Sequence, residues 1–212
     1  MIELGLKFTA AYLLGSMLGS LIVGQLRGGV DIRRVGSGNP GGTNALRTQG
    51  KTFAFWVMFI DVGKGILAVA LLPNLELFGF TIDPELSRDL VLYAVAFAAI
   101  LGHVYPLWFG FKGGKGGATA IGILCMLAPQ AAAVVIVIWI AIIALTGYVG
   151  LATMTGAVAA AVFVGATGLP DDIGLFAFAV ATAVLIVYTH RANIRRMRDG
   201  TEVRMGMLRR TR

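Results

Sequence analysis

The sequence predicts an all-α integral membrane protein, and three observations lead to this fold class. The chain has 212 residues, of which 57% are hydrophobic and only 14% are charged, whereas soluble domains have about 45–50% apolar and about 25% charged residues. The apolar residues form long continuous runs rather than the alternating pattern of a membrane β-barrel. Basic residues gather in a few of the polar segments between these runs, as in the cytoplasmic loops of membrane proteins.

The apolar runs can be compared with the about 20 residues that a helix needs to cross a bilayer. Runs near this length occupy residues 4–26, 52–72, 90–109, 130–146, 151–166 and 173–188. A further run, residues 118–128, would form a helix only about 16 Å long, and Pro129 separates it from the next run. We therefore expect seven transmembrane helical segments, one or more of them short. The first is expected to be a retained span, because no cleavable signal pattern accompanies it.

The charges of the connecting segments predict how the helices are oriented. Residues 27–51, residues 111–117 and the region after residue 190 are rich in Lys and Arg, whereas residues 73–89 hold four acids and one arginine. Basic loops remain on the cytoplasmic side, so we expect the N-terminus outside and the C-terminus in the cytoplasm. A single helix over 118–146 would place the basic tail outside, which is why 118–128 counts as a separate segment. The expected organisation is one polytopic membrane domain over 1–212, with a basic cytoplasmic tail at 194–212.

The net charge of +7 would suggest a nucleic-acid partner in a soluble protein. Basic cytoplasmic loops account for this charge in a membrane protein, so we expect membrane lipids, and no nucleic acid, as partners. Three polar clusters interrupt the apolar pattern on the predicted cytoplasmic side. These clusters are the candidates for function.

The first cluster is GSGNPGGTNALR, residues 36–47. Its glycines would let backbone amides approach an anion, Thr43 or Asn44 could cap a short helix facing that anion, and Arg47 could bind phosphate through two hydrogen bonds. The letters also match the dinucleotide-binding pattern G-x-G-x-x-G, but that motif needs a parallel sheet, which this chain does not predict. The alternative is a flexible cytoplasmic loop without a site.

The second cluster is GHVYPLWFGFKGGKGGAT, residues 102–119. Lys112 and Lys115 lie among glycines just ahead of the predicted short helix, an arrangement that suits a phosphate, although the spacing is not that of a P-loop. The alternatives are that the lysines only anchor the loop at the membrane surface and that His103 is a hydrogen-bonded core histidine.

The third cluster is HRANIRRMRDGTE, residues 190–202. His190 and Asn193 share a helix face by their spacing, whereas the arginines that follow suit acidic lipid headgroups. Asp61 and Lys64 also share a face inside the second span. Ionisable residues there are costly and are paired or functional, which leaves a structural ion pair and a site role as the two interpretations.

In this order and spacing, the three clusters resemble the signature motifs of the bacterial acyl-phosphate-dependent glycerol-3-phosphate acyltransferases, the PlsY family. The resemblance runs from the first helix to about Glu202. It implies a seven-helix inner-membrane enzyme of phospholipid biosynthesis with a cytoplasm-facing site. The enzyme would transfer a fatty acyl group from acyl phosphate to the 1-hydroxyl of glycerol 3-phosphate, giving lysophosphatidic acid and phosphate. No metal, other cofactor or protein partner is implied.

The resemblance also assigns residues. It implies catalytic roles for Ser37, Asn39, His103, Lys115 and His190. It implies substrate binding by Gly36, Gly38, Gly41, Thr43, Asn44, Arg47, Lys112, Gly113, Gly114, Gly150, Thr153 and Asn193. At Gly150 the chain departs from the family pattern, which has a serine there. Either Thr153 substitutes for that serine or the contact is lost.

We expect the amides of residues 36–41, with Ser37 and Asn39, to hold the acyl phosphate, and Arg47, Lys115, His190 and Asn193 to hold glycerol 3-phosphate. The acyl chain would lie between helices. His190, His103 or an oxygen of the acyl phosphate would accept the hydroxyl proton; a covalent acyl-Ser37 intermediate is the rival pathway. The competing functions are a carrier for an organic phosphate, whose site would lie nearer mid-membrane, and a lipid-binding scaffold.

Overall fold

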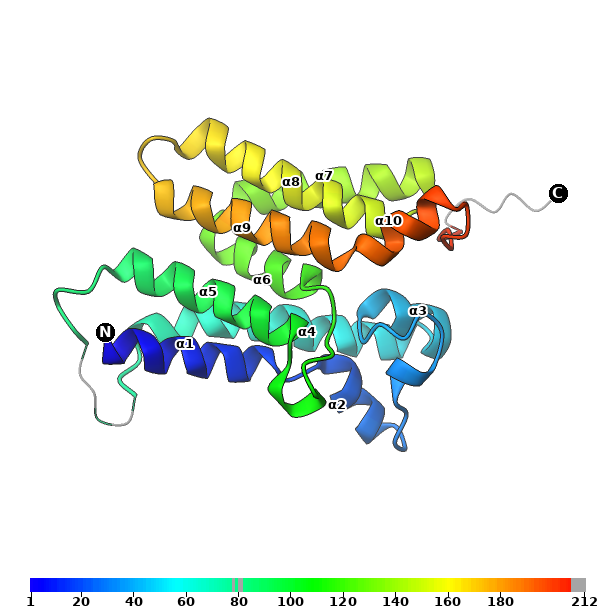
Figure 1. Ribbon diagram of the computed structural model, residues 1–212, viewed down its shortest axis with the longest axis horizontal. Helices are drawn as coiled ribbons and strands as arrows, with labels where there is room; N and C mark the ends of the chain where they lie inside the picture. Colours follow the sequence, from blue (N-terminus) through cyan, green and yellow to red (C-terminus); the bar gives the residue numbers. More distant parts are fainter. Residues whose placement is uncertain (78, 80–81, 207–212) are drawn as a thin grey trace. The chain divides into compact units, whose positions relative to one another are not determined.

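The structure, a computed structural model, describes residues 1–77, 79 and 82–206. Every regular secondary-structure element in these ranges is a helix, which confirms the predicted all-α class. The chain packs as two compact units, Met1–Leu127 and Ala128–Arg212 (Figure 1). A single domain over 1–212 stays a prediction, and the part of the predicted basic tail at 207–212 lies outside the described residues.

The first unit begins with a helix that bends. α1 (Ile2–Gly15) and α2 (Gly19–Leu26) together form the first predicted span, but their axes differ by 46°. The bend frees backbone carbonyls from helical hydrogen bonding, and those of Gly15 and Met17 accept hydrogen bonds from Lys64. A side chain distant in sequence therefore stabilises the break.

Three helices complete the bundle of the first unit. They are α4 (Lys51–Leu71), continued by the 3₁₀ turn η2 (Leu72–Asn74), α5 (Arg88–Val104) and the short α6 (Gly117–Leu127). Helix α5 packs beside α1 and runs in the same direction, and α4 contacts α2, α5 and α6 (Figure 1). Glycines allow this packing, because a Cβ at Gly15 or Gly102 would collide with backbone of the facing helix.

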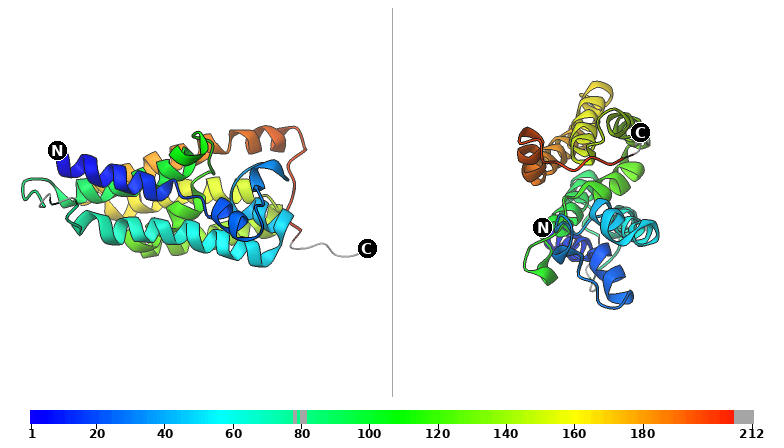
Figure 2. Two further views of the ribbon diagram at one scale, coloured as in Figure 1. Left: turned by 90° about the horizontal axis from the view of Figure 1, so that it is seen from below. Right: turned by 90° about the vertical axis from the view of Figure 1, so that its right-hand side faces the viewer.

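The polar segment after α2 is folded against the bundle. It contains the 3₁₀ turn η1 (Ile32–Arg34) and the helix α3 (Gly42–Gln49). Ile32 and Ala45 are fully buried against Val23, Phe53 and Val57, so an apolar cluster fixes a segment whose composition suggests a loop. The α2–α3 segment lies at the end of the unit opposite the N-terminus (Figure 2).

The second unit contains α7 (Pro129–Thr146), α8 (Val149–Gly168), α9 (Ile173–Thr189) and α10 (Arg191–Arg198). Helix α8 packs against both α7 and α9, and α10 contacts α8 and α9. Pro129 begins α7, where a missing amide hydrogen costs nothing, and Gly147 ends it with a left-handed backbone (φ 74°). Helix α10 continues α9 after a bend of 51°.

The helix lengths fit a membrane protein. In the described part of the chain, four helices are individually long and apolar enough to cross a bilayer, and six spans result if each bent pair counts as one. The short apolar α6 begins and ends one residue before the predicted limits of 118 and 128. The count of seven segments and the outside N-terminus stay predictions.

Candidate active site

Asn44 organises the first polar cluster. Its side chain is 2% exposed; Oδ1 accepts a hydrogen bond from the Ser37 amide (3.0 Å), and Nδ2 donates to the carbonyl oxygens of Val35 (3.0 Å) and Ile32 (3.2 Å). The prediction that Thr43 or Asn44 caps the helix is wrong, because Gly41 is the N-cap and no side chain caps α3. The Asn44 amide is turned back onto the preceding loop instead.

The predicted amide cradle over residues 36–41 also needs correction. The amides of Gly38, Asn39 and Gly41 donate to Val35 O (3.1 Å), Ser37 Oγ (3.4 Å) and Asn39 O (2.9 Å). The tight turns that glycine permits use up these hydrogens within the loop. Hydrogen-bond donors remain in the first turn of α3, where helix geometry leaves the amides of residues 42–44 without an intrahelical partner.

The glycines of this cluster make room for side chains. Gly36 has a left-handed backbone (φ 58°), and a Cβ there would collide with Asn44 Oδ1. A Cβ at Gly41 would lie 2.7 Å from Asn39 Nδ2. Ser37 is exposed, Asn39 and Thr43 are half-buried, and Arg47 is exposed on α3. The glycines thus hold the side chains of the cluster in a compact arrangement.

An ion pair stabilises the same loop. Arg33 donates through Nε (3.0 Å) and Nη2 (2.9 Å) to the two oxygens of Asp31. The Arg33 guanidinium therefore lowers the pKa of the Asp31 carboxyl below its ordinary value. The same guanidinium lies over the Phe109 ring, 5.5 Å from its centre. This contact joins the first polar cluster to the second.

The second cluster forms a loop at the same end of the first unit. The amides of Gly113 and Gly114 donate to Val104 O (3.1 Å) and His103 O (3.0 Å), so these two predicted substrate-binding residues use their amide hydrogens to attach the loop to α5. Lys112 is exposed and Lys115 half-buried, just before α6 begins. The loop therefore presents cationic side chains next to a helix N-terminus, as predicted.

His103 is a buried histidine at the end of α5. Its side chain is 3% exposed, and Nδ1 lies 2.9 Å from Lys64 Nζ. His103 is thus a buried, hydrogen-bonded residue, and its predicted catalytic role stays a prediction. In the described ranges, no group of three or more His, Cys, Asp or Glu residues is placed to hold a metal ion.

The third cluster lies where α9 passes into α10 in the second unit. His190 is 4% exposed, and its Nδ1 lies 2.7 Å from the Ile186 carbonyl oxygen. Because a carbonyl only accepts, Nδ1 must donate, which leaves the lone pair of the neutral ring on Nε2. Local backbone geometry therefore sets the tautomer of this histidine.

Glu202 belongs to the third cluster, although no role was expected for it from the sequence. Its side chain is 5% exposed, and the carboxylate accepts hydrogen bonds from Asn193 Nδ2 (2.7 Å) and Arg196 Nε (2.6 Å). The amides of Thr201 and Glu202 both donate to the Arg196 carbonyl, after a left-handed turn at Gly200 (φ 68°). The signal available in the sequence was an acid within a strongly basic tail.

Residues 201–206, called the strap below, continue from Glu202 across the α7–α8 turn. The Met205 amide donates to Gly147 O (2.7 Å), and Arg204 Nε donates to the Tyr148 hydroxyl (3.1 Å). The Met205 side chain packs on the apolar cluster formed by Ile143, Val149 and Ala152. The described part of the predicted basic tail is therefore folded onto the second unit.

Gly150 and Thr153 have different surroundings. A Cβ at Gly150 would lie 3.0–3.1 Å from the side-chain atoms of Asn193, so Asn193 packs directly against this glycine. The Thr153 hydroxyl donates to Val149 O (2.9 Å) and accepts from Trp139 Nε1 (3.2 Å), which ties α7 to α8. These bonds favour a structural role for Thr153 over substitution for the missing serine.

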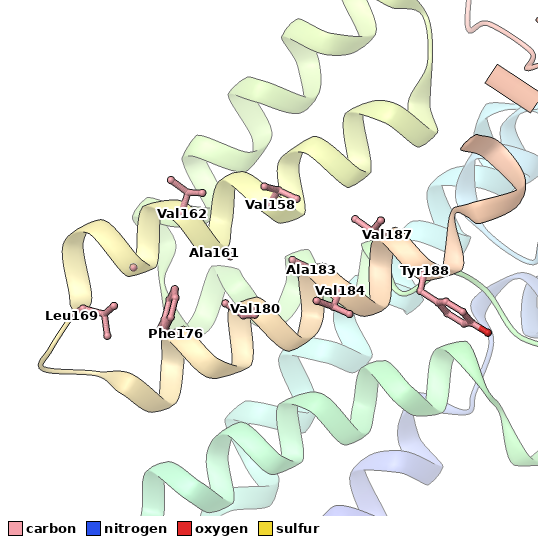
Figure 3. Close-up of a pocket in the computed structure, with 11 residues that line it drawn as sticks. Val158, Ala161, Val162, Leu169, Phe176, Val180, Ala183, Val184, Val187 and Tyr188 are labelled. Atoms are coloured by element: carbon pink, nitrogen blue, oxygen red, sulfur yellow. The ribbon is translucent and has the colours of Figure 1, made fainter. Parts of the chain in front are cut away.

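An apolar groove of about 790 Å³ lies between α8 and α9. Figure 3 shows its side chains along both helices, with Tyr188 at the end that leads into α10. The Phe176 ring rests against Gly165 at the other end, where a Cβ would lie 2.8 Å from the ring. Its lining consists of Val158, Ala161, Val162, Gly165, Leu169, Phe176, Val180, Ala183, Val184, Val187 and Tyr188.

Comparison with known proteins identifies the family. The family model described as glycerol-3-phosphate acyltransferase matches residues 6–200. The chain belongs to this family. It is similar to the glycerol-3-phosphate acyltransferases of Aquifex aeolicus (39% identity, covering 92% of this chain and 95% of the relative) and Zymomonas mobilis (41% identity, 95% of each).

Solved structures agree with the family assignment. The fold is similar to PlsY (YgiH), an integral membrane glycerol 3-phosphate acyltransferase, in its glycerol 3-phosphate form (TM-score 0.83, 38% identity, 97% of this chain and 96% of that chain). The lysophosphatidic acid form gives a TM-score of 0.81 at 36% identity, with the same coverage. The chain is therefore an acyltransferase and an integral membrane protein.

Proposed function

We propose that the chain transfers a fatty acyl group from acyl phosphate to the 1-hydroxyl of glycerol 3-phosphate, releasing lysophosphatidic acid and inorganic phosphate. The observation that carries the proposal is the gathering of cationic and amide groups at one end of the first unit. Two helix N-termini, Ser37, Arg47 and two lysines gather there, joined by the contact between Arg33 and Phe109. Amides at helix N-termini and cationic side chains suit phosphate groups, and both proposed substrates carry one.

We assign the donor phosphate to the first turn of α3, with Ser37 and Asn39 beside it. The other loop amides are used within the loop, so the cationic Arg47, Lys112 and Lys115 supply the remaining charge for the phosphates. In the second unit, Asn193 and His190 are assigned to glycerol 3-phosphate. His190 is fixed in the tautomer that carries its lone pair on Nε2, which suits it to accept a hydrogen bond from a hydroxyl.

The reaction needs no acyl-enzyme. The glycerol hydroxyl oxygen attacks the acyl carbon, the bond from that carbon to the phosphate oxygen breaks, and phosphate leaves with both electrons. Cations stabilise the charge that grows on the phosphate. The hydroxyl proton goes to His190 Nε2 or to an oxygen of the departing phosphate, and a His190→Gln variant that keeps the wild-type kcat would select the phosphate oxygen.

Ser37 is assigned to binding rather than to nucleophilic attack. Its Oγ accepts from the Asn39 amide at 3.4 Å, and the His103 ring, the histidine of the first unit, is buried against Lys64. The described part of this unit therefore places no histidine beside Ser37 to activate it, as a nucleophilic serine requires.

We assign the acyl chain of the donor to the groove between α8 and α9. From Phe176 to Tyr188 the groove follows about 18 Å of helix, close to the about 15 Å depth of one leaflet of the hydrocarbon core. The Arg191 guanidinium lies 4.4 Å from the centre of the Tyr188 ring, so a cation stands beside the end that leads to His190.

We also propose an inner-membrane location with the polar ends facing the cytoplasm. Basic residues dominate the segments that carry the three clusters, whereas the predicted outer loop at 73–89 is acidic, and this asymmetry supports the orientation. The N-terminus would then lie outside and the C-terminus inside.

Membrane vesicles containing the chain, given acyl phosphate and labelled glycerol 3-phosphate, test the function. Labelled lysophosphatidic acid is the expected product, and its absence, or its formation only with acyl-CoA, would contradict the proposal. Uptake of label without chemical change would indicate a carrier. Ser37→Ala and His190→Ala should each lower the rate strongly, whereas Ser87→Ala, at the start of α5 beside the acidic loop, should not.

A further inference from the structure

A buried charged cluster crosses the middle of the first unit. Asp61 and Lys64 lie one turn apart on α4, and His103 lies at the end of α5. Their side chains are only 1%, 3% and 3% exposed. Charged residues within membrane-spanning helices are costly and are retained where they are paired or functional, so this cluster calls for an explanation beyond the assigned substrate contacts.

Lys64 is the centre of the cluster. Its Nζ lies 3.0 Å from Asp61 Oδ1, 2.8 Å from the carbonyl oxygens of Gly15 and Met17, and 2.9 Å from His103 Nδ1. His103 Nδ1 also lies 3.5 Å from Asp61 Oδ1. A charged ammonium group only donates, so in its contact with Lys64 the Nδ1 atom accepts. Three hydrogens serve four acceptors, so one of them is shared. Lys64 thereby connects the α1–α2 bend, α4 and α5.

The opposite edge of the His103 ring touches the loop that carries the lysines. A Cβ at Gly114 would collide with His103 Nε2, so the ring lies directly against the backbone of this glycine. The adjacent amide bonds from Gly113 to Val104 O and from Gly114 to His103 O hold the loop to the same helix end. The ring and these two bonds together hold the backbone that carries Lys112 and Lys115.

The cluster is poorly suited to a purely stabilising role. In the described ranges, Asp61 Oδ2 has no hydrogen-bond partner although it is buried. An incompletely satisfied buried ion pair is less stable than a well-packed apolar replacement of the same volume. Selection for stability alone would favour the apolar replacement.

We infer that Asp61, Lys64 and His103 are positioning residues of the acyltransferase reaction. Lys64 holds the His103 ring in one orientation, Asp61 balances the charge of Lys64, and the ring fixes the phosphate-facing loop at 110–116. His103 takes no proton during the reaction. The inference rests on the proposed function, because it needs Lys112 and Lys115 to meet an anionic substrate.

The decisive comparison is between His103→Asn and His103→Leu. Asn places an oxygen where Nδ1 stands and can still accept from Lys64, but it has no basic nitrogen, whereas Leu can do neither. If His103 positions the loop, His103→Asn keeps kcat within about threefold of wild type and His103→Leu raises KM for a phosphate substrate about tenfold or more. Equal loss of kcat in both variants, with KM unchanged, would show that the ring nitrogen is used in catalysis and would overturn the inference.

A double variant, Asp61→Leu with Lys64→Met, removes both charges without leaving one unpaired. It should remain folded, raise KM in the same way, and speed hydrogen exchange at the amides of Gly113 and Gly114. The control is Thr182→Val, which removes a buried hydroxyl that has no partner among the described residues and should change none of these values. Wild-type kinetics in the double variant would mean that the cluster does not position the loop. A wild-type chain inactive with acyl phosphate would instead refute the proposed function, while the exchange measurement would still test the cluster.

Discussion

Glu202 should be essential for order at the polar end of the second unit, and Glu202→Ala tests this. The carboxylate accepts hydrogen bonds from Asn193 (2.7 Å) and Arg196 (2.6 Å), and the side chain is 5% exposed. Without it, a buried amide loses its acceptor and the strap loses the side chain that fastens its beginning. The strap then keeps its backbone bonds to Arg196 and the contacts of Arg204 and Met205, but loses its buried side-chain attachment.

The size of the effect follows from these two bonds. Hydrogen bonds to charged groups contribute about 1.5–3 kcal/mol each, and the bond to Arg196, whose side chain is 39% exposed, counts at the low end because solvent screens it. The free energy of unfolding should fall by about 3 kcal/mol. In a chain of this size each kcal/mol shifts Tm by about 2–4 °C, so Tm should fall by roughly 6–12 °C.

Thermal unfolding of the detergent-solubilised chain measures this shift. Glu202→Gln keeps an oxygen for Asn193 but loses the charge, so its Tm should lie between those of wild type and Glu202→Ala. The control is Glu85→Ala, an exposed glutamate whose loss should change stability by no more than about 0.5 kcal/mol. A Tm for Glu202→Ala within about 2 °C of this control would refute the reasoning.

Three further predictions concern the groove, the loop ion pair and Thr153. Val184→Trp should obstruct the groove and lower the ratio of kcat/KM for long over short acyl phosphates about tenfold, relative to Val137→Trp, a matched exposed valine (65% and 67% exposed) outside it; equal ratios would contradict the assignment. Arg33 lowers the pKa of Asp31 in the folded state. The ion pair therefore stabilises the folded loop fully at pH values above the ordinary pKa of Asp, about 4. This stabilisation is lost as the pH falls through the lower pKa of the folded state. Hydrogen exchange in residues 27–41 should show this loss, and Asp31→Asn should remove it. Thr153→Val should cost about 1 kcal/mol and leave KM for glycerol 3-phosphate unchanged; an increase in KM would restore Thr153 as a substrate contact.

Helix boundaries could be predicted from the sequence where a proline or glycine ends the helix. Pro129 separates α6 from α7, and Gly147 ends α7, so these boundaries agree with prediction to within a few residues. The bend between α1 and α2 could not be read in this way. Gly15, Ser16, Gly19 and Ser20 permit a kink there but do not require one, and the break is stabilised by Lys64, which is far away in sequence.

The candidate site shows the same division between composition and geometry. Residue types identified the three clusters and loop charges predicted one side for all of them; two lie at one end of the first unit, and their cytoplasmic position stays a prediction. Composition could not show which amides are already used, because that depends on backbone geometry: Gly38 and Gly41 donate within their own loop, and Gly113 and Gly114 donate to the end of α5. The contacts of Glu202 could not be predicted from composition, because they depend on how residues 201–206 fold.

Three glycines that pack against polar side chains of the three clusters have a common structural purpose, which differs from an amide cradle. Gly36 packs against the side-chain amide of Asn44, Gly114 against the ring of His103, and Gly150 against the amide of Asn193. In each case a polar side chain is buried by close contact with a backbone that has no Cβ, while hydrogen bonds fix its orientation. A larger residue would displace the polar group and not merely stiffen the loop. Phosphate binding would then depend on glycine indirectly, because it is the oriented side chains and the loops they hold that meet the substrate. This also accounts for Gly150: the space that a serine would occupy is bordered by Asn193 itself.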